Sequence, residues 1–225
     1  SALNLPDDKE IIMITKSDAE SSDSFLAQGG ICVLRDEQDY DSYFEDTMKA
    51  GHYENRKESV DIMIRSSGKI IEDLVGYGVE FEKDGEAFAY TREGAHSRPR
   101  ILFHADVTGK EITSKLLARV REKNNVTIYE YTTMTDILEE NGKCAGITVK
   151  TKSGEESSIY ADYTILASGG IGGLYQHSTN FPHLTGDTLA VAKKRPVRSN
   201  HTPRKQLQPC PGFLLRIPAV RAALF

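Results

Sequence analysis

The sequence has few cysteines, no long apolar run and no acidic residue near its end. Its three cysteines, Cys32, Cys144 and Cys210, are widely spaced and form no C-x-x-C pair, so neither a disulfide framework nor a zinc site is indicated. The apolar runs, such as residues 11–14, are far shorter than the roughly 18 residues that a membrane span requires. From the first residues we expect no signal peptide. We therefore expect a soluble cytoplasmic protein that holds no metal and meets no membrane.

The charge balance argues against nucleic acid as a partner. The 225 residues carry a net charge of -5, and 27% of them are charged. An acidic chain without a basic stripe before residue 193 would repel phosphates. The apolar content of 39% is enough for one core of ordinary size.

The hydrophobic periods predict an α/β fold. The run EIIMIT at 10–15 has no alternation, as expected for a parallel strand buried on both faces. Helices are expected at 39–50, 57–76 and 108–123, the last with Thr108 and Glu111 at the spacing of a capping box. Strands are expected at 101–106, 126–138, 144–151 and 157–167, and a hairpin at 79–91 that turns at Asp84-Gly85. An α/β sheet that carries an inserted β-meander fits this order.

A glycine-rich segment follows the last predicted strand, in ILASGGIGGLYQHSTNFPHLTGD at 165–187. Such bare backbone after a strand indicates that a ligand or another stretch of backbone comes too close to leave room for a Cβ atom. Further along, Thr185 is expected to be an N-cap and Asp187 to lie in the first turn of a helix, where the dipole favours a carboxylate.

The composition changes at residue 193. From residue 188 to the end there is no Asp or Glu, and five of the eight prolines lie in this part, at Pro196, Pro203, Pro209, Pro211 and Pro218. Because it has neither a helical nor a strand period, we expect residues 195–225 to contribute nothing to the fold and to be clipped quickly by proteases at Arg198, Arg204 or Arg216. We thus expect two parts, 1–192 and a basic, proline-rich tail at 193–225.

Three motifs carry a resemblance to a known family. They are SFLAQGGI at 24–31, TREGAHSRPRILFHADVTGKEI at 91–112 and the glycine-rich segment at 165–187. In this order they resemble the flavoprotein family of L-aspartate oxidase, succinate dehydrogenase and fumarate reductase. The resemblance implies an FAD/NAD(P)-binding, Rossmann-like domain and covers residues 1 to about 192.

The resemblance implies FAD as the cofactor. Two glycines of the A-Q-G-G loop, Gly29 and Gly30, would let backbone N–H groups approach the cofactor. No histidine lies in SSDSFLAQGG at 21–30, where succinate dehydrogenases attach FAD covalently, so the flavin would be held noncovalently. The implied contacts are Lys16, Asp23, Ser24, Phe25, Leu26, Ala27, Gln28, Gly29, Gly30, Thr133, Ala167, Gly169, Gly170 and Asp187. Three of these residues have an alternative explanation that needs no cofactor. Lys16 would be a solvated strand end, Thr133 would take part in ordinary strand pairing, and Asp187 would be favoured by the helix dipole.

Glu93 is implied as the residue that selects the substrate. Aspartate oxidases carry a glutamate at this motif, whereas the succinate and fumarate enzymes generally do not. A carboxylate there suits a substrate with a positive amine and would repel succinate. The resemblance thus implies oxidation of L-aspartate to iminoaspartate, with oxygen or fumarate as the electron acceptor; an exposed loop glutamate, a fumarate reductase fragment and a noncatalytic remnant are the alternatives. His96 and His104 are expected to be surface or strand positions.

Several family features are not found in this sequence. It contains no G-x-G-x-x-G motif, and neither the family's first strand nor its capping domain is recognised. We expect this chain to be truncated at both ends, its strand at 10–15 to lack a ladder neighbour, and its tail to reflect a shift of reading frame. FAD binding should then be weak, and the 225-residue chain nearly colourless and unable to release peroxide with L-aspartate.

Overall fold

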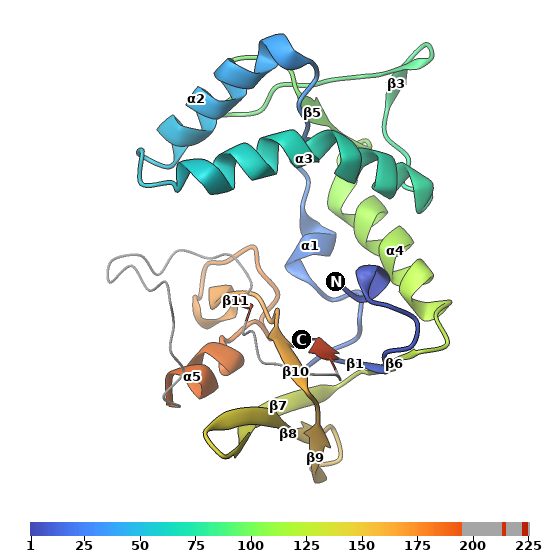
Figure 1. The fold of residues 1–225 in the computed structure, drawn as a ribbon, viewed down its shortest axis with the longest axis vertical. Helices are drawn as coiled ribbons and strands as arrows, with labels where there is room; N and C mark the ends of the chain where they lie inside the picture. The colour runs from blue at the N-terminus through green and yellow to red at the C-terminus, as the bar shows by residue number, and fades with distance from the viewer. Residues whose placement is uncertain (195–212, 215–221, 225) are drawn as a thin grey trace. The chain divides into compact units, whose positions relative to one another are not determined.

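The computed structural model describes residues 1–194, 213–214 and 222–224. The chain divides into two compact units, one made of Ser1–Asp23 and Arg119–Phe225, the other of Ser24–Ala118 (Figure 1). The boundary between residues 192 and 193 stays a prediction. Within the described ranges, no helix is long and apolar enough to cross a membrane.

The first unit is built on a mostly parallel sheet. Its strands are β1 (Ile11–Ile14), β6 (Val126–Tyr129), β10 (Tyr163–Leu166), β11 (Phe213–Leu214) and β12 (Ala222–Leu224), in the order β11-β10-β12-β1-β6. β1 pairs in parallel with β6 and with β12, β10 pairs in parallel with β12, and β11 lies antiparallel on β10. The expected buried parallel strand is confirmed in β1, whose end residues Ile11 and Ile14 are buried.

Two expectations about the tail are wrong. Strand β12 lies between β1 and β10, with Ile11 opposite Ala222 and Tyr163 opposite Ala222. Part of the stretch 195–225 therefore belongs to the sheet, and β1 has a ladder neighbour on this side. A strand of three residues is too short to show a period in the sequence, which explains the error. The proposed cleavage points Arg198, Arg204 and Arg216 lie outside the described residues.

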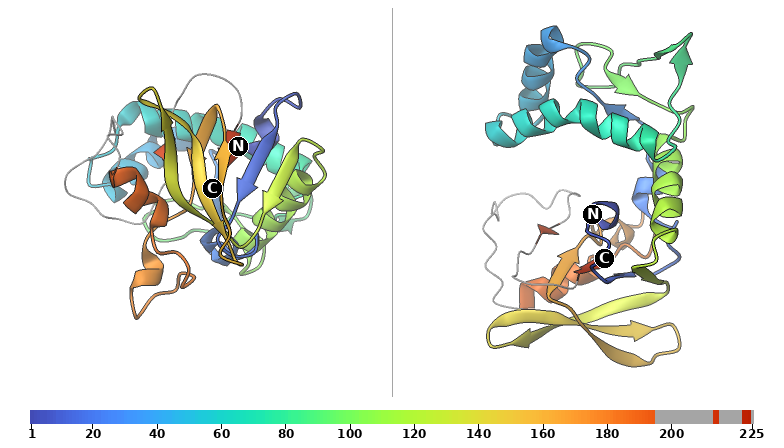
Figure 2. Two further views of the ribbon diagram at one scale, coloured as in Figure 1. Left: turned by 90° about the horizontal axis from the view of Figure 1, so that it is seen from below. Right: turned by 45° about the vertical axis from the view of Figure 1, so that its right-hand side comes forward.

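A separate antiparallel sheet in the first unit confirms the inserted meander. It consists of β7 (Thr132–Glu140), β8 (Lys143–Thr151) and β9 (Glu156–Tyr160), drawn in yellow tones in Figure 2. Asn141 and Gly142 both have positive φ in the turn between β7 and β8, as a type I′ turn requires. The predicted strands at 126–138 and 157–167 are each divided between the two sheets, because Tyr131 (φ 51°) breaks the first and residues 161–162 break the second.

The core of the first unit joins both sheets to the last helix. Helix α5 (Asp187–Lys194) packs against β7, and the 3-10 turns η1 (Ala2–Asn4) and η3 (Gly172–Leu174) complete the unit. One buried cluster contains Ile14, Met134, Ile137, Ile147, Val149, Leu166 and Val191. This packing fixes the loops that follow β1 and β10.

The second unit is mainly helical. Helices α2 (Tyr40–Ala50) and α3 (Lys57–Gly76) lie next to each other in Figure 1. They pack on each other through Tyr43, Met48, Val60 and Ile64. The other elements are η2 (Glu37–Asp39), β2 (Ile31–Cys32), β3 (Lys83–Asp84), β4 (Ala87–Phe88) and β5 (Ile101–Leu102). The chain enters this unit through α1 (Asp23–Leu26) and leaves it through α4 (Thr108–Arg121). The helices predicted at 39–50, 57–76 and 108–123 are confirmed as α2, α3 and α4. In α2 and α3 an apolar stripe faces the core.

Two local predictions in the second unit need correction. The hairpin is present, but Lys83 pairs with Phe88 and Asp84 with Ala87, so the turn is made by Gly85 and Glu86, one residue later than expected. The capping box does not form. The Thr108 hydroxyl accepts a hydrogen bond from the His104 N–H (3.0 Å), and the Glu111 carboxylate accepts from the Glu80 N–H (3.0 Å).

Candidate functional site

An ion pair lies beyond the carboxyl end of β1. The Lys16 Nζ is 2.5 Å from Asp187 Oδ2 and 2.7 Å from Thr185 Oγ1, and Thr185 Oγ1 donates to Asp187 Oδ1 at 2.9 Å. The side chains of Lys16 and Asp187 keep 34% and 38% of their surface exposed, so both remain open to a ligand. Because α5 begins at Asp187, Gly186 precedes the helix, and the expectation that Thr185 is the N-cap is wrong.

The glycines after β10 have two different roles. Gly169 has φ of +74°, a conformation that L side chains rarely adopt. A Cβ atom at Gly172 would collide with the Asn180 side chain, and one at Gly173 with the backbone of Pro182. Glycine at 173 is therefore required by the chain's own backbone, whereas the limit at 172 comes from a side chain. Ala167 is exposed and Gly170 half-buried, next to the strand end.

Asp23 fixes the same glycine-rich loop. Its carboxylate accepts hydrogen bonds from the Asn180 side-chain amide and, at 3.1 Å, from the Phe181 N–H. The residues are 157 and 158 positions apart in sequence, so the contact could not be read from spacing. Asp23 thus has a structural partner in the first unit, and its contact with a cofactor stays a prediction.

Thr133 lies in β7 opposite Lys150 of β8. This is ordinary strand pairing, the alternative that the sequence left open. The start of β7 is tied to the end of β1, because the Thr132 N–H donates to the Thr15 carbonyl (2.9 Å) and the Tyr131 N–H to the Ser17 carbonyl (3.0 Å). Thr133 therefore lies close to the strand end that carries Lys16, and its contact with the cofactor stays a prediction.

In the second unit, the A-Q-G-G loop is exposed and leaves space at one glycine. Gly30 has φ of +85°, and a Cβ atom there would collide with the Leu102 carbonyl, so pairing of β2 with β5 explains this glycine. Gly29 differs, because a Cβ atom there would meet nothing within 4 Å. Among the residues that the structure describes, no contact requires glycine at position 29. The loop's other residues, Ser24, Leu26, Ala27 and Gln28, are exposed, whereas Phe25 is half-buried.

The loop that carries Glu93 is anchored at both ends. Thr91 forms a β-bridge with Ile101, and the Ser97 N–H and Oγ both donate to Asp46 Oδ2 at 2.7 Å. The Glu93 carbonyl accepts from the His96 N–H at 3.3 Å, which closes a turn, while the Glu93 residue itself is exposed. The structure therefore presents the Glu93 carboxylate to solvent on a held loop.

A buried charge network that the sequence did not predict lies behind this loop. Arg100 is fully buried, and it contacts Asp39 through Nε (3.0 Å) and NH2 (2.8 Å) and Asp46 through NH1 (2.7 Å). His96 lies within it, with Nδ1 3.1 Å from Arg100 NH1 and Nε2 3.3 Å from the Cys32 Sγ. The expectation that His96 is a surface or strand position is wrong. His104 is in contact with the Glu80 carbonyl at 2.9 Å.

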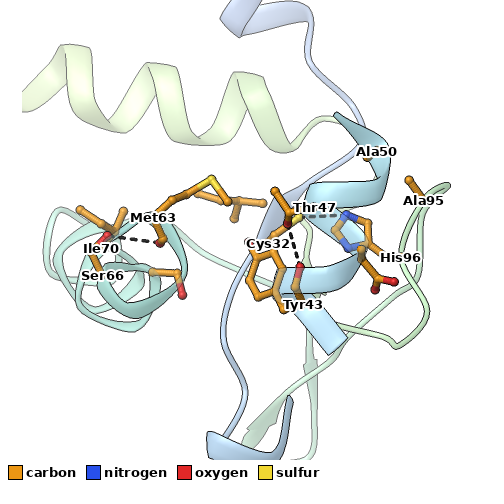
Figure 3. A pocket seen from close by; sticks show the side chains of 12 residues that line it. Cys32, Tyr43, Thr47, Ala50, Met63, Ser66, Ile70, Ala95 and His96 are labelled. Carbon is orange, nitrogen blue, oxygen red and sulfur yellow. Dashed lines mark hydrogen bonds between the residues drawn. The ribbon is translucent and has the colours of Figure 1, made fainter. Parts of the chain in front are cut away.

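A cavity of about 460 Å³ opens beside this network in the second unit (Figure 3). Cys32, Tyr43, Asp46 and His96 form part of its wall, and Met63 and Ile70 of α3 face them. Burial raises the pKa of the Cys32 thiol, so this thiol is neutral at ordinary pH. In the described part of the chain, no group of three or more His, Cys, Asp or Glu side chains could hold a metal ion.

The network makes stability depend on pH. Burial, followed by the nearby Arg100 charge, lowers the pKa of His96. Burial would raise the pKa of Asp39, but hydrogen bonds from Arg100 and Ser42 outweigh it and the pKa is lowered. A group with a depressed folded pKa stabilises the fold above its unfolded pKa and loses this contribution as the pH falls.

We expect stability to fall in two steps as the pH is lowered, because protons bind more readily to the unfolded chain. The first step begins below about pH 6.5, the ordinary pKa of an unfolded histidine, and the second below about pH 4, the ordinary pKa of an unfolded aspartate. Urea unfolding between pH 8 and pH 3, followed by circular dichroism, measures this. The variant His96→Gln should lack the first step and keep the second. An unchanged first step in that variant would contradict the assignment to His96.

A family model described as "FAD binding domain" matches residues 2–223. This chain belongs to that family. The match extends across the boundary that the composition predicts at residue 193. The chain is 41% identical over 213 residues to the L-aspartate oxidase of Clostridium perfringens, which covers 95% of this chain and 48% of that protein. It is 39% identical over 198 residues to the enzyme of Clostridium acetobutylicum, covering 88% of this chain and 45% of the relative.

Solved structures confirm the fold. A quinol-fumarate reductase matches 81% of this chain and 32% of its own, with a TM-score of 0.77 and 24% identity. Mycobacterium smegmatis Sdh1 in its apo form matches 83% of this chain and 38% of its own, with a TM-score of 0.74 and 22% identity. The chain spans about half the length of the curated relatives it matches. The predicted family and the incomplete FAD-binding fold are therefore confirmed.

Each unit, taken by itself, contains residues that fit FAD. The space at Gly29 would let backbone N–H groups of the A-Q-G-G loop approach a ligand. Lys16 and Asp187 offer a cation and a hydrogen-bond acceptor, both partly exposed, beyond a strand end of the parallel sheet. Such strand ends are where open α/β sheets bind nucleotides. Each observation fits a dinucleotide with anionic and hydroxyl groups.

Proposed function

We propose that this chain is the FAD-binding part of an L-aspartate oxidase, which oxidises L-aspartate to iminoaspartate in the first step of NAD biosynthesis. Similarity to curated aspartate oxidases at 39% and 41% identity supports the family branch. The observation that supports L-aspartate as the substrate is the exposure of the Glu93 residue on an anchored loop. Glu93 lies within the motif that aspartate oxidases share.

For the first unit, we propose that Lys16, Asp23, Thr133, Ala167, Gly169, Gly170 and Asp187 contact FAD. The Lys16 ammonium can attract an anionic or hydroxyl oxygen, and the Asp187 carboxylate can accept a hydrogen bond from a hydroxyl. Both side chains are already aligned by their contacts with each other and with Thr185. Little side-chain entropy is then lost when the cofactor binds.

For the second unit, we propose that Ser24, Phe25, Leu26, Ala27, Gln28, Gly29 and Gly30 contact FAD. The stretch 21–30 contains no histidine, so FAD is held noncovalently. When bound, FAD supplies the acceptor for the hydride that leaves the α-carbon of the substrate. The protein's part is to hold that carbon in place, and the electron acceptor that follows is oxygen or fumarate.

Glu93 is proposed to orient the substrate through its amine. L-aspartate carries a positive amine at neutral pH, and a carboxylate placed beside it gains a charge-assisted hydrogen bond. Succinate and fumarate have no such group, so an exposed carboxylate would repel them. A second candidate, the flavoprotein part of a fumarate reductase, is favoured by the fold likeness alone and is disfavoured by Glu93.

The substitution Glu93→Gln in the complete enzyme tests this proposal. Loss of a hydrogen bond between charged groups, worth about 1.5–3 kcal/mol, should lower kcat/KM for L-aspartate by roughly 10- to 100-fold. Steady-state kinetics with fumarate as the acceptor measure it. Glu86→Gln, in the exposed β3–β4 turn of the same unit, is the matched control and should change nothing. Equal kinetics in the wild type and in Glu93→Gln would contradict the role of Glu93.

A further inference from the structure

Every donor of the buried Arg100 guanidinium has an acceptor. Its Nε and NH2 reach the two oxygens of Asp39 at 3.0 and 2.8 Å, and NH2 also reaches Ser42 Oγ at 2.8 Å. Its NH1 reaches Asp46 Oδ2 at 2.7 Å and His96 Nδ1 at 3.1 Å. Guanidinium has five N–H groups in a rigid fork and accepts no hydrogen bond. The five contacts therefore use all of them.

This geometry fixes the tautomer of His96. Since Arg100 can only donate, His96 Nδ1 must accept, and the imidazole proton lies on Nε2. The Nε2–H then points to Cys32 Sγ, 3.3 Å away. A second proton on His96 would place an N–H against an N–H of Arg100 and break this bridge.

The same network holds the loop that carries Glu93. His96 is bound through its ring, and Ser97 is bound twice to Asp46, a carboxylate that Arg100 also holds. The His96 N–H closes the turn on the Glu93 carbonyl. His96 and Ser97, three and four positions after Glu93, are thus both held by Arg100, the first directly and the second through Asp46.

A buried ion network of this kind is a poor source of stability. Burying charges costs solvation that their mutual attraction often only balances, and apolar residues of similar volume would stabilise the fold as well or better. The network instead fixes the positions of the side chains around Arg100, because a guanidinium whose five donors are all hydrogen-bonded permits one arrangement of its partners.

We propose that Arg100 is a positioning residue for Glu93, acting through Asp46 and His96 to hold the loop 92–98 in the conformation that presents the Glu93 carboxylate. This inference rests on the proposed function, since it assigns a purpose to the presentation of Glu93. The buried Arg100 holds the loop in one conformation, and the exposed Glu93 carboxylate on that loop binds the substrate amine.

NMR on the isotope-labelled 225-residue chain tests the geometry without substrate or flavin. We expect the nitrogen shifts of His96 to show the Nε2–H tautomer. Asp46→Asn should raise the hydrogen-exchange rate of the Ser97 amide by about tenfold or more, while the Val33 and Ile101 amides of the β2–β5 region change less than about twofold. Asp61→Asn, which breaks an exposed ion pair with Arg65 in the same unit, is the control and should change neither.

The pH profile separates positioning from plain stabilisation. The charged groups that act on His96 are Arg100, Asp46, Asp39 and Glu93, and Tyr43 meets its ring edge-on. As the pH falls, protection of the loop amides should decrease with the titration of His96 and before that of the strand amides. His96→Gln retains one acceptor and one donor, so it should keep the loop ordered and remove this pH dependence.

Three outcomes overturn the proposal: the other tautomer, an unchanged Ser97 amide in Asp46→Asn, or equal loss of protection in loop and strands. Failure of the proposed function gives a different pattern. In that case the NMR results stand, but Glu93→Gln leaves the kinetics of the complete enzyme unchanged. If both proposals hold, Asp46→Asn in the complete enzyme raises KM for L-aspartate several-fold and leaves the flavin content unchanged.

Discussion

Arg100→Met is expected to lower the free energy of unfolding by about 3–5 kcal/mol, because it leaves the buried Asp39 carboxylate without its cation. The Arg100 and Asp39 side chains are 0% and 3% exposed, so water cannot replace the lost partner. Urea unfolding, followed by circular dichroism and by hydrogen exchange at the Val33 N–H that donates to the Arg100 carbonyl, measures the loss.

Arg65→Met is the matched control for this prediction. Arg65 pairs with Asp61 at 2.8 Å, but its side chain is 53% exposed, and exposed pairs contribute only about 0–1 kcal/mol. The double variant Asp39→Asn with Arg100→Met should recover part of the loss, since it removes the stranded charge. A loss in Arg100→Met no larger than in Arg65→Met would contradict the account of the network.

Local pattern was enough to predict most of the elements. The helix expected at 57–76 is α3 with the same bounds, because a long amphipathic stripe has one stable way to pack. The buried strand at β1 also followed from residues next to one another. The family resemblance further indicated the cofactor, which composition and period alone do not reveal.

The remainder depends on contacts between distant residues. Arg100 lies 61 residues from Asp39, and Asp23 lies 157 from Asn180, so no spacing rule brings either pair together. Strand β12 pairs with β1 across most of the chain. The break at Tyr131 also depends on tertiary context, since its N–H donates to the Ser17 carbonyl. Within the segment HSRPR at 96–100, His96 and Arg100 lie four residues apart, and this close spacing was a local signal for the contact between their side chains.

Gly29→Val is expected to weaken FAD binding by at least about tenfold while leaving the fold intact. A Cβ atom at this position would meet nothing within 4 Å, so the chain itself has room for the side chain. A cofactor against the backbone would not have that room, and the branched side chain would hold it away from the loop's N–H groups. Gly68→Val is the matched control, because a Cβ atom there also meets nothing within 4 Å.

The most direct test is a titration of FAD into the wild-type chain, Gly29→Val and Gly68→Val, with flavin fluorescence as the signal and urea unfolding measured alongside. The account predicts saturable noncovalent binding in the wild type, the same dissociation constant in Gly68→Val, and one at least about tenfold higher in Gly29→Val at unchanged stability. No saturable binding by the wild type, or equal affinity in all three proteins, would contradict it.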